Sequence, residues 1–181
     1  MSQTNELEIM ERIALDLEGV EESLASSFNT GAEDFNALIR PLSAAGGKRL
    51  RAQLCLLIAN AGTSVERQRI RIAEAVEMLH LATLIHDDVL DQAEIRRGEE
   101  TIHMHKGNKV AILSGDYLFA KAFQIVSEMP NMKYLQVFSH IITCLVEGEF
   151  MQMEDVYRID QGIERYMTKT QKKTADFMEG C

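Results

Sequence analysis

Apolar residues recur every three or four positions along most of the chain, which is the spacing of one face of an α-helix. The first such series predicts an amphipathic helix with an acidic outer face, and its apolar positions are Leu7, Met10, Ile13, Leu17, Val20 and Leu24. A shorter helix around Phe35 and Leu38 is expected to stop at Pro41, because the residue before a proline resists helical dihedrals. Both segments predict helices whose apolar faces need partners.

The longest apolar series lies in the middle of the chain. A glycine turn at residues 46–47 precedes a predicted helix over 48–60, which Gly62 can close as a left-handed cap. Residues 63–66 match a capping box and predict that the next helix, over 65–91, begins there. That helix is apolar nearly all round over much of its length, which places it in the middle of a helical bundle.

The remainder of the chain also favours helix. Residues 92–107 are polar and non-periodic, and we expect a loop there before a helix over 108–128. Asn131 can cap a further long helix, and Asp160 can cap a last one that runs to Met178. Neither β-alternation nor an internal repeat is present, so the sequence predicts an all-α fold. Residues 1–181 are expected to form a single domain of antiparallel helices around one core.

Composition excludes several classes of protein. The 181 residues carry a formal net charge of −9, which argues against a general nucleic-acid binder because phosphate binding needs a cationic face. Three widely spaced cysteines fit neither a disulfide framework nor a zinc cluster, so we expect a reducing cytoplasm. The first residues lack the cationic and apolar blocks of a signal peptide, and we find no uncharged apolar stretch long enough to cross a bilayer.

An acidic cluster ends the predicted central helix. Asp87 and Asp91 are one helical turn apart, so their carboxylates project from one face, with Asp88 beside them. Carboxylates with room for further ligands suit Mg²⁺ that also bridges substrate phosphates. The alternative is a solvated last turn, but negative charge at a helix C-terminus opposes the helix dipole. A magnesium site over Asp87 and Asp91 is therefore the stronger interpretation.

Two basic clusters could complete such a site. Lys48, Arg49 and Arg51 follow the glycine turn at a helix start, where free amides favour an anion, and Arg96 and Arg97 follow the aspartates. Arginine binds phosphate oxygens through two parallel hydrogen bonds. Each cluster alone is more often a solvated surface. Together with the aspartates they predict a diphosphate site.

These motifs, in this order, resemble those of the trans-isoprenyl diphosphate synthases of the long-chain type, such as heptaprenyl and octaprenyl diphosphate synthases. The segments that carry the resemblance are GGKRLR at 46–51, HLATLIHDDVLD at 80–91, RRG at 96–98, SGDYL at 114–118, Gly148-Glu149 and Lys173-Thr174. One DDxxD motif is weak support, whereas the ordered set is specific. The resemblance implies the isoprenoid synthase helical bundle.

The resemblance also implies residue roles. Asp87 and Asp91 would hold Mg²⁺ for the allylic diphosphate, with Asp88 supporting them. The residues expected to bind isopentenyl diphosphate are Lys48, Arg51, His80 and Arg97. Those expected to bind the allylic diphosphate, farnesyl or geranylgeranyl, are Arg96, Lys173 and Thr174, with Lys173 also counted as catalytic. Without the resemblance, His80 would be interpreted as a core histidine. The implied product is a long all-trans polyprenyl diphosphate for a quinone side chain, made by a homodimer.

Small residues near the aspartates predict a long product. Thr83 lies about 40° from Asp87 around the helix and Val76 about 20° from it, deeper in the bundle. In the family, bulky aromatic residues one turn before the aspartates block the pocket, whereas Ala82 and Thr83 would leave it open. We expect its floor deeper down, at residues that are equally well explained as core: Phe119 and Phe123.

One family feature is missing from the sequence. The second aspartate motif does not occur, and the nearby acids Glu147, Glu149, Glu154 and Asp155 do not form it. We therefore expect the chain to be the N-terminal portion of a synthase, with weak diphosphate binding and poor turnover alone. A regulatory subunit without catalysis is the first alternative.

A phosphohydrolase of the HD type is the second alternative, suggested by the pair His86-Asp87. It is weaker, because His103, His105 and His140 lack the spacing that its metal site needs.

Overall fold

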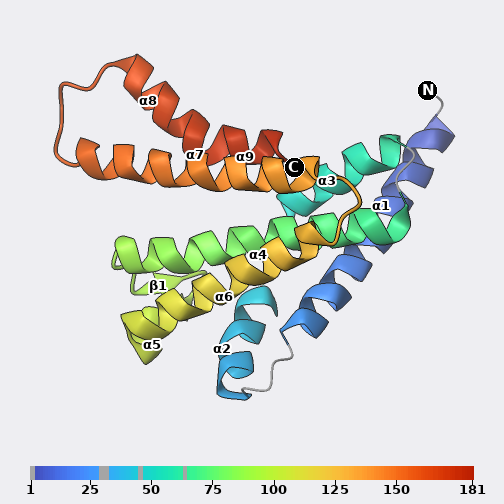
Figure 1. Ribbon diagram of the computed structural model, residues 1–181, viewed down its shortest axis with the longest axis horizontal. Helices are drawn as coiled ribbons and strands as arrows, with labels where there is room; N and C mark the ends of the chain where they lie inside the picture. The colour runs from blue at the N-terminus through green and yellow to red at the C-terminus, as the bar shows by residue number, and fades with distance from the viewer. Residues whose placement is uncertain (1–2, 29–32, 45–46, 63–64) are drawn as a thin grey trace. The chain divides into compact units, whose positions relative to one another are not determined.

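The computed structural model describes residues 3–28, 33–44, 47–62 and 65–181, and these residues fold into two compact units. Unit 1 comprises residues 1–126 and unit 2 residues 127–181. Helices dominate both units, as the sequence predicted (Figure 1).

Unit 1 is built around α4 (Glu66–Leu90). The helices α1 (Gln3–Ser27) and α3 (Leu50–Ala61) pack against α4 and against each other (Figure 1). All side chains of α4 from 73 to 79 are buried, which confirms the prediction of a central helix. Apolar contacts supply most of this core, because the fully buried residues include Val20, Leu24, Leu56, Val76, Met78 and Leu79.

Charged residues also cross the interface between α1 and α4. Arg69 donates to Asp16 through Nε at 2.6 Å and through Nη2 at 2.9 Å, and both side chains are buried. Burial would raise the pKa of Asp16, but the hydrogen bonds from Arg69 and Asn60 hold it below the usual value. The pair fixes the register of the two helices, because neither charge could remain buried alone.

The rest of unit 1 follows α4 in sequence. Two short antiparallel strands, β1 (Ile95–Arg96) and β2 (Glu99–Glu100), are followed by α5 (Ile102–Lys106) and α6 (Asn108–Ser127). The short helix α2 (Glu33–Ala44) precedes α3 and meets α6 where the rings of Phe35 and Tyr117 are 4.7 Å apart. By length and composition α6 could cross a membrane, but a single such helix is weak support because core helices pass the same test.

Unit 2 consists of α7 (Lys133–Asp155) and a helical segment that folds back along it (Figure 1). That segment is continuous through α8 (Ile163–Thr170), the π-helical turn η1 (Gln171–Ala175) and α9 (Asp176–Glu179). Its core is formed by Phe138, Ile141, Cys144 and Phe177. The last predicted helix is present, with an unpredicted π-turn in its middle.

Several predicted element ends were wrong. The helix α2 continues through Pro41 to Ala44, since a proline restrains the residue before it without excluding a helix. Gly62 closes α3 with an extended backbone, φ −101°, in place of the left-handed cap. The last helix begins after Gly162, so Asp160 does not cap it. Of the predicted capping box, Thr63 and Ser64 lie outside the described residues.

Two other local predictions differ from the structure. The N-cap position of α7 is occupied by Met132 and not by the predicted Asn131, although the Oδ1 atom of Asn131 accepts from the amide of Lys133 at 3.0 Å. The stretch 92–107, predicted as a loop, contains the hairpin and α5 instead. Its strands have two residues each, which is too short to leave an alternating pattern.

Candidate functional site

The acidic cluster lies at the end of α4, and its three carboxylates are in different surroundings. Asp87 is half-buried in the last turn, and Asp91 is exposed at the C-cap, where its amide donates to the Asp87 carbonyl at 2.8 Å. Asp88 is buried, and its Oδ1 accepts from Arg96 Nε at 2.6 Å. Burial raises the pKa of Asp88, and the Arg96 hydrogen bond partly offsets that rise. Asp88 therefore anchors Arg96, while Asp87 and Asp91 remain the candidates for a metal.

Two hard carboxylates suit a magnesium ion that completes its shell with water and phosphate oxygens. Within the described ranges, no group of three His, Cys, Asp or Glu side chains is arranged to hold a metal. Two carboxylates alone leave most of the coordination positions of such an ion open for water or for the oxygens of a bound diphosphate.

The last turn of α4 is fixed by His86, which packs into α6. Its Nε2 lies 3.1 Å from the carbonyl oxygen of Ile112 and 3.5 Å from Oδ1 of Asp116, and its ring centroid is 5.4 Å from that of Phe119. A Cβ on Gly115 would lie 2.2 Å from this Nε2. The SGDYL motif therefore supplies the space that seats His86, next to Asp87, a contact that sequence reasoning missed.

The basic residues before α3 differ in burial and in the direction of their side chains. Arg49 is buried in a left-handed conformation, φ 47°, whereas Lys48 is exposed. Arg51 Nη1 lies 3.3 Å from His80 Nε2, and since a guanidinium only donates, the histidine must accept. Burial, together with the charges of Arg51, Arg97, Arg96 and Arg49, lowers the pKa of His80 to about 3. His80 is therefore neutral near pH 7 and lies in a concentration of positive charge.

The second basic cluster is shaped by the hairpin. Arg97 and Gly98, both with positive φ, form the two-residue loop that joins β1 to β2, as expected for a type I′ turn. A Cβ on Gly47 would lie 3.1 Å from Arg97 Nη2, so this guanidinium rests beside the backbone that leads to Lys48. The structure thus brings together two basic clusters that are about 50 residues apart.

A cavity of about 640 Å³ lies on a neighbouring face of α4. Leu81, Leu84, Ile85 and Asp88 line it from α4, and other lining residues come from α2, the hairpin and α5. Arg96 and Arg97 border it as well. One cavity therefore joins apolar walls to cationic and acidic groups.

The predicted chain-length residues are not among those that line this cavity. Val76 and Ala82 are fully buried, Thr83 is half-buried with its hydroxyl donating to the His80 carbonyl, and Phe119 and Phe123 are half-buried in α6. Thr83 lies on the same face of α4 as Asp87, whereas the α4 residues that line the cavity lie on the neighbouring face. The chain-length assignment stays a prediction.

In unit 2, Lys173 and Thr174 lie in the π-turn η1, a geometry frequent at functional sites. Lys173 donates to Glu149 and, at 3.0 Å, to Gln152. A Cβ on Gly148 would lie 2.8 Å from Lys173 Cγ. The motif Gly148-Glu149 therefore has a structural explanation, because the glycine admits η1 and the glutamate binds Lys173.

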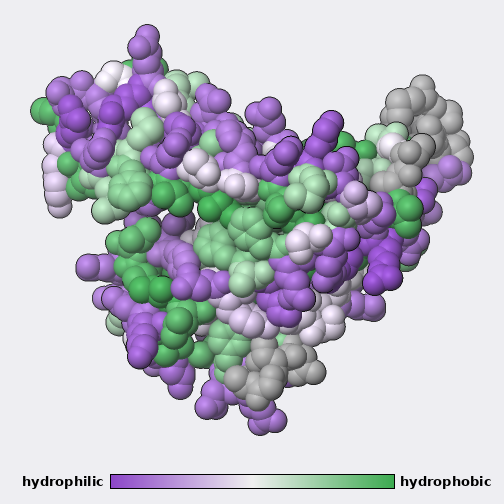
Figure 2. All heavy atoms as spheres, in the orientation of Figure 1, coloured by the Kyte–Doolittle hydropathy of each residue, from purple (hydrophilic) through white to green (hydrophobic). Residues whose placement is uncertain are grey.

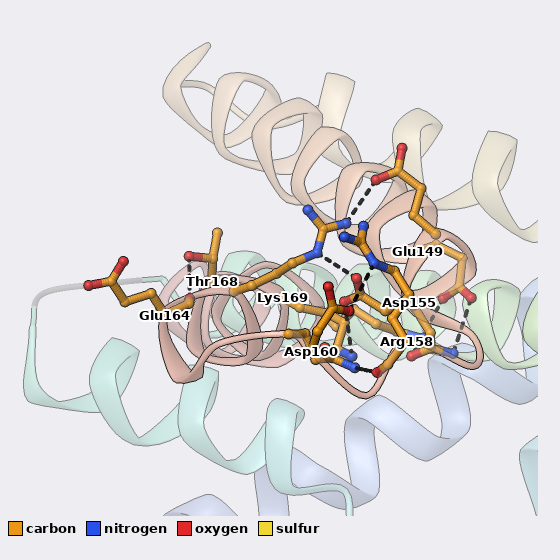
Figure 3. A network of polar contacts seen from close by, with 12 residues as sticks. Glu149, Asp155, Arg158, Asp160, Glu164, Thr168 and Lys169 are labelled. Atoms are coloured by element: carbon orange, nitrogen blue, oxygen red, sulfur yellow. Dashed lines mark hydrogen bonds and ion pairs between the residues drawn. The ribbon is translucent and has the colours of Figure 1, made fainter.

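Acidic and basic residues hold the two helices of unit 2 together (Figure 3). Asp155 lies between Arg165 and Lys169 of α8, at 2.5 and 3.5 Å. Burial would raise the pKa of Asp155, but the Arg165 hydrogen bond holds it below the usual value. The network orients the segment that carries Lys173.

Comparisons of the sequence with known proteins give matches to one family. The family model described as Polyprenyl synthetase matches residues 32–181. Octaprenyl diphosphate synthase of Escherichia coli (strain K12) is 34% identical over 173 residues, which are 96% of this chain and 54% of that protein. Heptaprenyl diphosphate synthase component 2 of Geobacillus stearothermophilus is 38% identical over 161 residues, 88% of this chain and 50% of that protein.

A solved structure gives the same result for the fold. Polyprenyl synthase from Caulobacter crescentus CB15, complexed with calcium and isoprenyl diphosphate, has a TM-score of 0.90 and 32% identity over 95% of this chain and 52% of its own. The predicted isoprenoid synthase fold is confirmed. The chain spans about half the length of the curated relatives it matches.

Proposed function

Because the chain belongs to the polyprenyl synthetase family, we propose that it takes part in joining an allylic diphosphate to isopentenyl diphosphate, giving a long all-trans polyprenyl diphosphate for a quinone side chain. The observation that carries the proposal is the contact of His80 with Arg51, on the helix that ends in the acidic cluster. Family membership argues against the HD phosphohydrolase, and the regulatory subunit stays an alternative.

Isopentenyl diphosphate is assigned to Lys48, Arg51, His80 and Arg97. Arg51 contacts His80, and Arg97 rests beside Gly47, so these groups can converge on one anion. The neutral histidine can offer an N–H to a phosphate oxygen, because its Nε2 accepts from Arg51 and the proton must then be on Nδ1.

The allylic diphosphate is assigned to the end of α4. Asp87 and Asp91 would hold Mg²⁺, which when bound neutralises the departing diphosphate and so favours ionisation of the allylic C–O bond. Arg96 uses Nε to bind Asp88, and we assign its terminal amino groups to the same diphosphate. The apolar walls formed by Leu81, Leu84 and Ile85 would keep water from the allylic cation.

Large apolar side chains are exposed on both units, and hydrophobic residues reach the surface in Figure 2. In unit 2 they include Val137, Val146, Phe150 and Met153 on α7. Such faces are covered in a larger assembly, and this supports the proposal of a homodimer. A cytoplasmic location remains our expectation.

The proposal is tested by incubating the protein with farnesyl diphosphate, isopentenyl diphosphate and MgCl₂ and sizing the products by mass. Products longer than geranylgeranyl diphosphate would establish the proposed reaction. Binding of isopentenyl diphosphate without product, measured by calorimetry, would support substrate binding, and it would agree with the poor turnover expected of this chain alone. Absence of both would contradict the proposal.

Product length gives a separate prediction. Thr83→Phe places a ring on the face of α4 that bears Asp87, and we expect the longest product to shorten by several isoprene units. The Thr83 hydroxyl is bonded within its own helix, so its loss should cost little. The control is Leu84→Phe, which places a larger side chain in the lining of the cavity on the neighbouring face of α4 and so narrows that cavity. Shortening by Leu84→Phe with no effect of Thr83→Phe would assign the product chain to that cavity.

A further inference from the structure

Glu77 is a buried carboxylate in the middle of α4 that belongs to none of the motifs considered above. It is 3% exposed. Its Oε1 accepts from the backbone amide of Ala52 at 3.2 Å, and its Oε2 accepts from Arg49 Nη1 at 3.2 Å. Both partners belong to the segment where the basic loop becomes α3. Burial of a carboxylate is costly unless such partners are present, so the contact needs an explanation.

Arg49 is the residue that Glu77 holds. It has a left-handed backbone, φ 47°, although it is not glycine, and its side chain is buried. A second carboxylate, Glu21 of α1, accepts from its Nε at 2.6 Å and from its Nη2 at 3.1 Å. A non-glycine residue keeps this conformation when its surroundings fix it. The two glutamates, one from each of two helices, provide that restraint.

Glu77 also caps α3. Arg49 occupies the N-cap position, and its side chain makes no capping hydrogen bond. The amide of Ala52 is three residues further on, which is a position that a capping side chain normally satisfies. Glu77 supplies this acceptor from another helix. One carboxylate thus fixes both the backbone at Arg49 and the first turn of α3.

We propose that Glu77 is a positioning residue for the diphosphate site, acting through Arg49. With Arg49 drawn inward, Lys48 is exposed on one side of it and Arg51 reaches His80 on the other. Release of Arg49 would let the loop leave its left-handed conformation. Lys48 and Arg51 would then no longer be held in the positions from which both can bind one diphosphate. This inference rests on the proposed function, because it assumes that these two residues bind diphosphate.

Glu74 provides a matched control. It lies one turn earlier on α4 and is fully buried. It accepts hydrogen bonds at 2.6 Å from Ser23, Ser27 and Arg71. These partners are on α1 and α4, so Glu74 joins α4 to α1 without reaching the basic loop. Loss of its charge should destabilise unit 1 and leave the loop in place.

The experiment compares Glu77→Gln with Glu74→Gln. Calorimetry with isopentenyl diphosphate should show affinity about tenfold weaker for Glu77→Gln and within about twofold of wild type for Glu74→Gln. Hydrogen exchange should be faster at residues 47–52 in Glu77→Gln, whereas Glu74→Gln should affect α1. Equal effects of both variants on affinity and exchange would overturn the proposal, since they would indicate general destabilisation.

A second variant covers the case in which Glu77→Gln does not fold. Arg49→Gln removes the guanidinium from the loop side, and it should reproduce the faster exchange at residues 47–52 and the weaker binding. Unchanged exchange there would overturn the proposal. A wild-type protein that binds no isopentenyl diphosphate would count against the proposed function, and the exchange data would then decide on Glu77 separately.

Discussion

Asp87→Ala is expected to weaken the Mg²⁺-dependent binding of inorganic diphosphate by about 10- to 100-fold. Asp87 and Asp91, at the end of α4, are the ligands proposed for the metal, whereas Asp88 accepts a hydrogen bond from Arg96. Removing one of two protein ligands leaves the metal held mainly by the diphosphate itself. Calorimetric titration with diphosphate, with MgCl₂ and with EDTA, measures the loss.

The control for this prediction is Glu94→Gln, which removes one exposed negative charge close to the cluster. Its effect should be less than about twofold, because an exposed charge is screened by water and salt. If both variants weaken binding equally, the site acts through its net charge and not through coordination. If Asp87→Ala binds as tightly in MgCl₂ as the wild type does, Asp87 is not a metal ligand.

The central helix could be predicted from sequence because it depends on burial alone. Helix α4 is buried on all sides from residue 73 to residue 79, so apolar residues occupy every face there, and that pattern is visible in the sequence. Two of its buried residues, Glu74 and Glu77, were not recognised as core. Their partners lie up to 51 residues away, and local sequence gives no sign of such pairing.

The hairpin was missed for a different reason. Its two strands are too short for any periodic signal, and its stability comes from its turn and from the Arg96 bond to Asp88. Arg97 followed by glycine was the available signal, since a type I′ turn needs two residues with positive φ. Arg96 and Arg97 were predicted as phosphate-binding residues from their charge. The structure adds that the turn sets the direction of the Arg97 side chain.

The roles of the glycines in the motifs could not be predicted from sequence, because they arise from tertiary contacts. Gly115 and Gly148 are both helical, where a glycine is ordinarily unfavourable compared with alanine. Each lies against a side chain from a distant segment, His86 for Gly115 and Lys173 for Gly148. Sequence therefore identified the motifs as a pattern, and the packing explains why they contain glycine.

Gly115→Ala is expected to destabilise unit 1 by about 2 kcal/mol or more, the usual scale for overpacking a filled core. In an open helix the same change would stabilise by about 1 kcal/mol, so the sign of the effect is diagnostic. The new Cβ would lie 2.2 Å from His86 Nε2 and 2.4 Å from its Cδ2, and the ring would have to move. Urea unfolding measures the change, and Gly162→Ala, where a Cβ meets nothing within 4 Å, is the control without a steric contact; as the N-cap of α8 it should cost less than about 1 kcal/mol.

A double-mutant cycle separates this steric effect from a general loss of helix packing. His86→Ala removes the ring, so Gly115→Ala should become harmless or stabilising in that background, with a coupling energy of at least about 1 kcal/mol. Simple additivity of the two changes would contradict the contact. Because His86 precedes Asp87, the displaced ring should also shift the acidic turn. Gly115→Ala protein that remains folded should therefore bind diphosphate with a weaker dependence on Mg²⁺ than the wild type.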